Sequence, residues 1–134
     1  MVKKISLYQE VELHAKVASA SPHRLVQLLY EASLSHLQLA QQLLQLPEAD
    51  RIQRAAVDRA LAKSVDIVIE LRDSLDLNIG SDIPHNLDLL YEYIERRLLH
   101  ARLKKDLAAV NESLSLLETL KSGWDAIAQS DQLG

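Results

Sequence analysis

The sequence predicts an all-α protein: an antiparallel four-helix bundle preceded by a flexible or short-helical N-terminal segment. Glycine and proline occur only three times each in 134 residues, and the apolar content of 48% is dominated by strong helix formers. Apolar residues recur at helical spacing in four successive stretches. Short connections separate these stretches, and short connections favour antiparallel packing of consecutive helices.

The first helix is expected at residues 22–46. Ser21 is a suitable N-cap, because its hydroxyl can accept a hydrogen bond from a free amide of the first turn. Pro22 fits the first helical position, where the missing N–H costs nothing. A wide apolar stripe follows, which predicts that one side of this helix faces the core.

The second helix is expected at residues 48–77. Pro47 ends the first helix and opens this one, and Glu48 and Asp50 suit the positive end of its dipole. Gly80 is expected to provide the C-terminal cap, because glycine adopts the left-handed conformation without steric cost.

The third and fourth helices are expected at residues 82–102 and 106–129. Ser81 or Asp82 caps the third helix. No glycine or proline separates the two, but a single helix through both would be roughly 70 Å long and would bury little surface. The basic residues before Asp106 suit a helix C-terminus, so we place a turn near 103–105.

These elements divide the chain into an N-terminal tail or cap segment, 1–21, and a bundle, 22–130. The absence of cysteine excludes disulfides and thiolate metal sites. A net charge of −4 argues against a nucleic-acid partner, and no apolar run is long enough for membrane insertion. The composition therefore predicts a cytoplasmic helical protein, and no motif indicates a cofactor or a catalytic residue.

Several short motifs share their order and spacing with one family of helical proteins. Each is ordinary bundle sequence by itself, but together they cover nearly the whole chain. The chain resembles the FliS family, the flagellin-specific export chaperones of bacterial flagella. The motifs that carry the resemblance are Tyr8, Ala20-Ser21-Pro22, Leu29-Tyr30, Asn86-Leu87, Leu90-Tyr91 and Trp124.

The resemblance implies a binding protein and not an enzyme. It implies two partners, the disordered C-terminal segment of flagellin and the cytoplasmic domain of the export gate component FlhA. It also implies that the chain holds flagellin unpolymerised in the cytoplasm, as a monomer or a weak homodimer. The residues expected at the partner surface are Ile5, Leu7, Tyr8, Leu29, Tyr30, Asn86, Leu90 and Tyr93.

The aromatic residues and the tail have separate expectations. Tyr91 is in register with the apolar face of its helix and is expected in the core, whereas Tyr93 is turned away and expected to be exposed. Trp124 is expected to plug one end of the bundle. Tyr8 and its apolar neighbours are expected to fold back over an exposed groove, because apolar side chains in water are costly.

Two alternative functions remain open. One is a histidine phosphotransfer bundle, in which His100 accepts a phosphate near Lys104 and Lys105, although these lysines fit the usual spacing poorly. The other is a structural dimeric helical adaptor.

Overall fold

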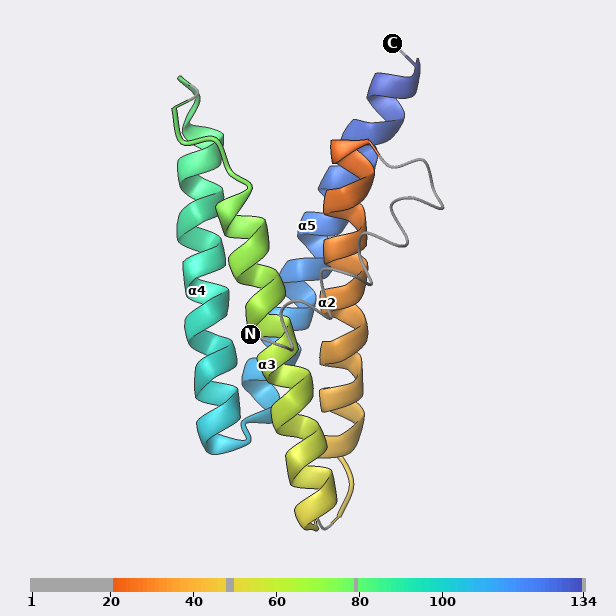
Figure 1. Cartoon of the computed structure of the whole chain (residues 1–134), viewed down its shortest axis with the longest axis vertical. Helices are drawn as coiled ribbons and strands as arrows, with labels where there is room; N and C mark the ends of the chain where they lie inside the picture. Colours follow the sequence, from red (N-terminus) through yellow and green to blue (C-terminus); the bar gives the residue numbers. More distant parts are fainter. Residues whose placement is uncertain (1–20, 48–49, 79, 134) are drawn as a thin grey trace.

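The computed structural model describes residues 21–47, 50–78 and 80–133, with side chains described as far as residue 127. Four helices lie in this part of the chain: α2 (Pro22–Leu44), α3 (Arg51–Asp73), α4 (Asp82–Lys104) and α5 (Leu107–Leu133). Successive helices run in opposite directions (Figure 1). Because α2 and α4 each pack against both α3 and α5, α2 and α4 are diagonal to each other. The predicted antiparallel four-helix bundle is confirmed.

Local capping explains where α2, α4 and α5 begin. The Ser21 hydroxyl accepts a hydrogen bond from the Arg24 amide at 3.2 Å, and the Ser81 hydroxyl accepts one from the Ile83 amide at 3.2 Å. Before α5 the chain turns at Lys105, whose φ of 53° and ψ of 43° are left-handed. The Asp106 carboxylate then accepts from the Ala108 amide at 3.0 Å, so the break overlaps the predicted turn.

Both predicted ends of the second helix are wrong. Helix α3 begins at Arg51 and not at 48, because Asp50 and Gln53 form a reciprocal capping box, with N···O distances of 2.8 and 3.1 Å. It ends at Asp73, well before Gly80. There the Ser74 hydroxyl donates to the Leu71 carbonyl at 2.7 Å. The other helix bounds lie within about two residues of those expected, except that α5 extends to Leu133 and not to 129.

The core runs along the axis of the bundle and receives side chains from every helix. Its largest fully buried aliphatic side chains come from α2 (Leu37), α3 (Leu61), α4 (Ile94 and Leu98) and α5 (Leu117). Three serines are also buried, and each donates its hydroxyl to a carbonyl of its own helix, so no cost of an unpaired group arises. These serines are Ser33, Ser64 and Ser113.

Two tyrosines join the diagonal helices through the core. Tyr30 of α2 and Tyr91 of α4 are each 3% exposed, and their hydroxyl oxygens lie 2.5 Å apart in a hydrogen bond. Burial raises the pKa of both phenols, so both stay protonated. The expected core position of Tyr91 is confirmed.

Charged side chains fix α4 to its two neighbours. Arg72 of α3 contacts three carboxylates of α4, at 2.6 Å to Asp88, 3.1 Å to Glu95 and 3.6 Å to Glu92. Further along, Arg102 of α4 pairs with Asp58 of α3 at 3.1 Å. The α4–α5 side carries a further ion pair, Arg97 with Glu112 at 2.7 Å. Two of the basic residues in the second half of α4, Arg97 and Arg102, therefore hold the bundle together.

The tyrosine pair generates a stability prediction. Tyr91→Phe leaves the Tyr30 hydroxyl buried without its partner, and we expect a loss of about 1–3 kcal/mol in the free energy of unfolding. The double variant Tyr30→Phe/Tyr91→Phe removes both hydroxyls and should cost less than the sum of the single changes. Urea unfolding of the four chains measures this; additive losses would show that the two hydroxyls do not interact.

The Arg72 contacts predict a change in acid stability. The hydrogen bond from Arg72 lowers the pKa of Asp88 below its ordinary value of 3.8. The unfolded state therefore binds more protons than the folded state, and the stabilisation, complete above that value, is lost as the pH falls through the folded pKa. In Arg72→Met the urea midpoint should fall less between pH about 6 and pH about 3 than it does in the unchanged chain.

The matched control for this measurement is Arg51→Met, which removes an exposed arginine from the start of the same helix. Its acid dependence should match that of the unchanged chain. Equal acid dependence in Arg72→Met would instead show that Asp88 titrates without help from Arg72.

Candidate functional site: an apolar cavity at one end of the bundle

The bundle is open at the end where α2 and α4 begin. Figure 1 shows the α3–α4 pair diverging from the α2–α5 pair toward this end. A cavity of about 520 Å³ lies between the pairs, within the size range of about 300–1,000 Å³ that is usual for ligand sites. All four helices or their immediate ends contribute to its wall, which is mostly apolar. The lining residues are Pro22, His23, Leu25, Val26, Tyr30, Ser74, Leu75, Asp76, Pro84, Leu87, Tyr91 and Trp124.

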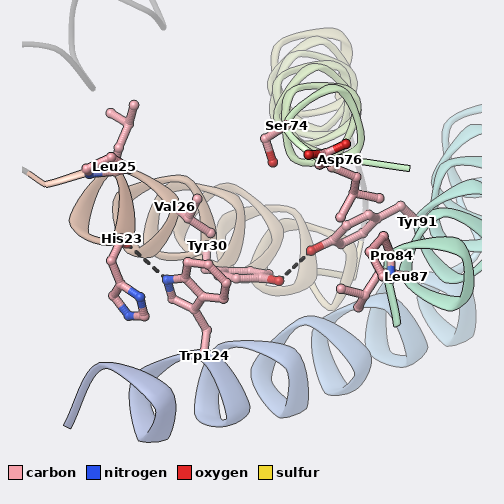
Figure 2. Close-up of a pocket in the computed structure, with 12 residues that line it drawn as sticks. His23, Leu25, Val26, Tyr30, Ser74, Asp76, Pro84, Leu87, Tyr91 and Trp124 are labelled. Atoms are coloured by element: carbon pink, nitrogen blue, oxygen red, sulfur yellow. Dashed lines mark hydrogen bonds between the residues drawn. The ribbon is translucent and has the colours of Figure 1, made fainter. Parts of the chain in front are cut away.

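The tyrosine pair forms the inner wall of this cavity. Figure 2 shows the bond between Tyr30 and Tyr91 spanning it, with Leu87 one turn nearer the start of α4. Because the phenol hydroxyls satisfy each other, the inner wall presents ring carbon to the cavity. Apolar side chains entering from outside would therefore meet a surface with which they can pack.

Trp124 closes the side of the cavity that α5 forms. Its indole Nε1 donates to the His23 carbonyl oxygen at 2.9 Å, and its ring stacks on the His23 imidazole with centroids 4.3 Å apart and planes inclined by 10° (Figure 2). The hydrogen bond falls on the first turn of α2, where the stack also lies. Trp124 therefore fixes the start of α2 against α5 while one of its faces stays available to the cavity.

Polar contacts beside Trp124, just outside the apolar lining, fix the α5 wall of the cavity to α2. The Asp125 carboxylate accepts from Gln27 Nε2 of α2 at 2.6 Å and from Lys121 Nζ at 2.6 Å. The hydrogen bond from Lys121, with a smaller contribution from Gln27, lowers the pKa of Asp125. Asp125 is thus ionised near neutral pH and links α2 to α5 just outside the apolar lining.

The residues expected from sequence at the partner surface do not gather in one place. Tyr30 lines the cavity. Leu29 and Leu90 are half-buried and pack against the core, and Asn86 is exposed on the first turns of α4. Ile5, Leu7 and Tyr8 lie outside the described residues, so both their position and the expected fold-back of the tail stay predictions.

Tyr93 differs from its expected exposure. It is half-buried on the α5 side of α4, where its hydroxyl donates to Glu112 at 2.7 Å, and the Arg96 guanidinium lies 5.9 Å from its ring centroid. The hydrogen bond to Glu112 raises the pKa of Tyr93 and lowers that of Glu112. The prediction was wrong because helical periodicity turned Tyr93 from the core but could not show that it reaches a neighbouring helix.

Sequence reasoning did not assign most of the cavity wall to a partner. His23, Val26 and Leu87 are not among the residues expected at the partner surface, and Trp124 is expected only as a plug of the bundle end. Trp124 does lie at one end of the bundle, half-buried as part of a wall. One signal was present: the motifs Ser21-Pro22, Asn86-Leu87 and Trp124 fall at helix positions that an antiparallel bundle brings to the same end.

His100, the residue of the phosphotransfer alternative, lies far from the cavity in the last turns of α4. Its Nε2 is 3.2 Å from a carboxylate oxygen of Asp106, so the imidazole bridges the turn between α4 and α5. Among the described residues no group of three potential ligands is placed to hold a metal ion. None of the described helices is long and apolar enough to cross a membrane.

Comparisons with known proteins agree on one family. Residues 4–131 match the family model described as Flagellar protein FliS. The Pseudomonas aeruginosa flagellar secretion chaperone FliSB is 36% identical over 127 residues, which cover 95% of this chain and 97% of that protein. The Salmonella typhimurium flagellar secretion chaperone FliS is also 36% identical, over 92% of this chain and 89% of its own length.

A solved structure supports the fold independently. A crystal structure described as a flagellar chaperone from bacteria superposes with a TM-score of 0.71 over 92% of this chain and 98% of that one. The identity is 18%, so this likeness concerns the arrangement of the helices. The family match spans nearly the whole sequence, including the helices that form the cavity. The chain therefore belongs to the FliS family of flagellar secretion chaperones.

Proposed function

We propose that this protein is a cytoplasmic export chaperone that binds the disordered C-terminal segment of flagellin. On this proposal it prevents flagellin from polymerising before export and delivers it to the export gate, where the cytoplasmic domain of FlhA receives it. Neither step requires catalysis or a cofactor. The observation that carries the proposal is the open apolar cavity in a member of the FliS family.

Family membership supports the role in export. The relatives from Pseudomonas aeruginosa and Salmonella typhimurium are both named flagellar secretion chaperones, and each aligns over most of its length. A protein partner in flagellar export follows from that name. Flagellin is the partner that the motif resemblance implies, and it needs a chaperone because it assembles readily into filaments.

The cavity supports binding of an apolar helix. Its lining comes from α2, α4, α5 and the chain just after α3, so a bound segment would contact the whole end of the bundle. Leu25, with 39% of its surface exposed, stands at the rim and extends the apolar surface outward. A disordered segment that folds here must offset its ordering cost by burying apolar area, and such surfaces favour amphipathic helices.

The binding residues follow from the cavity. We assign partner contact first to Val26, Leu87 and Trp124, with Tyr30 as part of the inner wall. Asn86, Leu90 and Tyr93, expected from sequence, lie outside this lining and are secondary candidates on α4. His100 is assigned to the α4–α5 turn, where Asp106 contacts it.

Binding at the cavity should change the fluorescence of Trp124, the only tryptophan of the chain. We expect a tryptophan-free peptide of the flagellin C-terminus to gain helix on mixing, with a negative heat-capacity change. Its binding should shift the Trp124 emission, because water leaves the exposed part of the indole. Circular dichroism, calorimetry and fluorescence titration measure these effects.

The variant Leu87→Asp places a charge in the cavity wall and should weaken binding of the flagellin peptide by about tenfold or more. Ile52→Asp is its control, because Ile52 is 76% exposed on α3 and is not part of the cavity lining. A peptide that binds both variants equally would show that flagellin binds elsewhere. Full binding of flagellin lacking its C-terminus would contradict the proposed partner.

The tail supplies a further prediction. Ile5, Leu7 and Tyr8 are apolar side chains in a short segment that precedes the cavity-lining residues Pro22 and His23. If this segment covers the cavity in the free protein, deleting residues 1–10 should tighten peptide binding, because a competitor is removed. Weaker or unchanged peptide binding by the deletion variant would show instead that the tail supports the fold and does not compete for the cavity.

A Tyr8→Ala chain that binds flagellin but fails in secretion would assign Tyr8 to the export gate.

A further inference from the structure

The end of the bundle opposite the cavity is basic. There the ends of α2 and α4 meet the starts of α3 and α5, and the start of α3 reaches furthest outward (Figure 1). The chain as a whole has a net charge of −4, so its positive charge is concentrated at this end. We call this surface the basic end. Its basic side chains belong to the start of α3 and the end of α4, and they are Arg51, Arg54, Arg102, Lys104 and Lys105.

Helix stability does not explain the basic residues of α3. The start of a helix is the positive end of its dipole and favours acidic side chains in the first turn. Beyond the Asp50 cap, α3 has no acidic residue there, and Arg51 and Arg54 stand in their place. Because the dipole repels these two arginines, their charge is unfavourable for the helix that carries them. We therefore look for its role outside the helix.

Much of this charge is not neutralised within the bundle. Among the described residues, Arg51, Lys104 and Lys105 form no ion pair. The nearby carboxylates of Asp50 and Asp106 are used as helix caps, at 2.8 Å and 3.0 Å from the amides that they accept. The charge of the basic end is thus available to an anionic surface outside the protein.

The basic end also exposes apolar side chains. Leu103 is 82% exposed and Ile52 is 76% exposed, the highest values among the large apolar side chains that the structure describes. Both project where the surface of the bundle is convex, beside the basic residues (Figure 1). Exposed apolar side chains flanked by lysine and arginine are typical of protein surfaces that enter the headgroup region of an anionic bilayer.

We propose that the basic end binds an anionic lipid surface. Ile52 and Leu103 enter the headgroup region, and the basic side chains contact the lipid phosphates. A deformable lipid surface suits two apolar side chains that project from a convex end, because they can sink into it. The protein lies on this surface without crossing it, in keeping with the lack of a membrane-spanning helix in the described part of the chain.

The charge distribution also orients the bound protein. Asp73, Asp76 and Asp82 lie near the open end of the bundle, so an anionic surface repels that end and attracts the basic end. The cavity then faces away from the lipid and stays accessible. The proposal does not rest on flagellin binding, because the two sites lie at opposite ends of the bundle.

Flotation with vesicles tests the proposal on the full chain without flagellin. Vesicles of phosphatidylglycerol and phosphatidylcholine should bind the protein, and vesicles of phosphatidylcholine alone should not. Raising the salt from about 0.1 M to about 1 M should release most of the bound protein, because the screening length falls from about 10 Å to about 3 Å. Deleting residues 1–10, which include Lys3 and Lys4, should leave vesicle binding unchanged, because they are not part of the basic end.

Charge reversal identifies the surface that binds. Arg51→Glu/Lys104→Glu should weaken vesicle binding by about tenfold or more, since each basic residue near an anionic surface contributes about fivefold. The new carboxylate of Arg51→Glu suits the helix dipole, so the melting temperature of this single variant should not fall and its loss of binding cannot come from unfolding. Lys63→Glu is the matched control, because it makes the same change of charge near the middle of α3.

A neutral variant and tryptophan fluorescence test the apolar contact. Ile52→Asn/Leu103→Asn keeps the charge but removes both apolar side chains, and should weaken vesicle binding by about tenfold or more. Brominated lipids should not quench Trp124, which lies at the open end, but should quench the added indole of Leu103→Trp.

Four outcomes overturn the proposal. The first is a chain that does not bind anionic vesicles; if it binds poly-glutamate and Arg51→Glu/Lys104→Glu does not, the basic end belongs to an acidic protein segment. The second is vesicle binding that Lys63→Glu or the tail deletion abolishes, since the contact then lies elsewhere. The third is full binding by the neutral variant, which would show adsorption by charge alone. The fourth is quenching of Trp124, which would show that lipid enters the cavity.

Discussion

The hydrogen bond between Tyr30 and Tyr91 is the constraint on which the open end of this bundle depends. Two hydroxyls buried in a core must pair with each other or with another polar group, and here they pair across the diagonal between α2 and α4. Two phenol rings end to end set the separation of these helices at that level. Nearer the end of the bundle the facing residues are Val26 and Leu87, which are shorter. Their side chains are too short to fill the space between helices that the two tyrosines hold apart, and the unfilled space is the cavity.

The other walls of the cavity depend on hydrogen bonds and a ring stack near the helix ends. Trp124 would be free to rotate into the space, but its bond to the His23 carbonyl and its stack on the imidazole hold it at the side. Gln27 and Asp125 join the same two helices a turn away. On α2, α4 and α5 the open end is therefore bounded by side chains that hydrogen bonds hold in place, so the cavity has its shape in the folded protein before any partner binds.

Much of this architecture could be predicted from the sequence, because the signals that specify it are local. Ser21 and Ser81 cap their helices through bonds to amides two or three residues away, and helical periodicity placed Tyr91 in the core. The end of α3 could not be predicted from Gly80. Ser74 bonds back to Leu71, and the chain leaves the helix before the glycine is reached. The cavity also escaped prediction, since the indole of Trp124 meets the carbonyl of His23 across 101 residues of sequence.

Helix α4 connects the two surfaces of the molecule. Leu87 and Tyr91 line the cavity near the start of α4, and Leu103 belongs to the basic end. Asp88 fixes this part of α4 to Arg72, and Tyr91 fixes it to α2. A displacement of α4 that widens the cavity must strain these two bonds and must also move Leu103. A partner in the cavity and a lipid surface at the basic end would therefore affect each other through α4. The strength of this coupling depends on the two bonds.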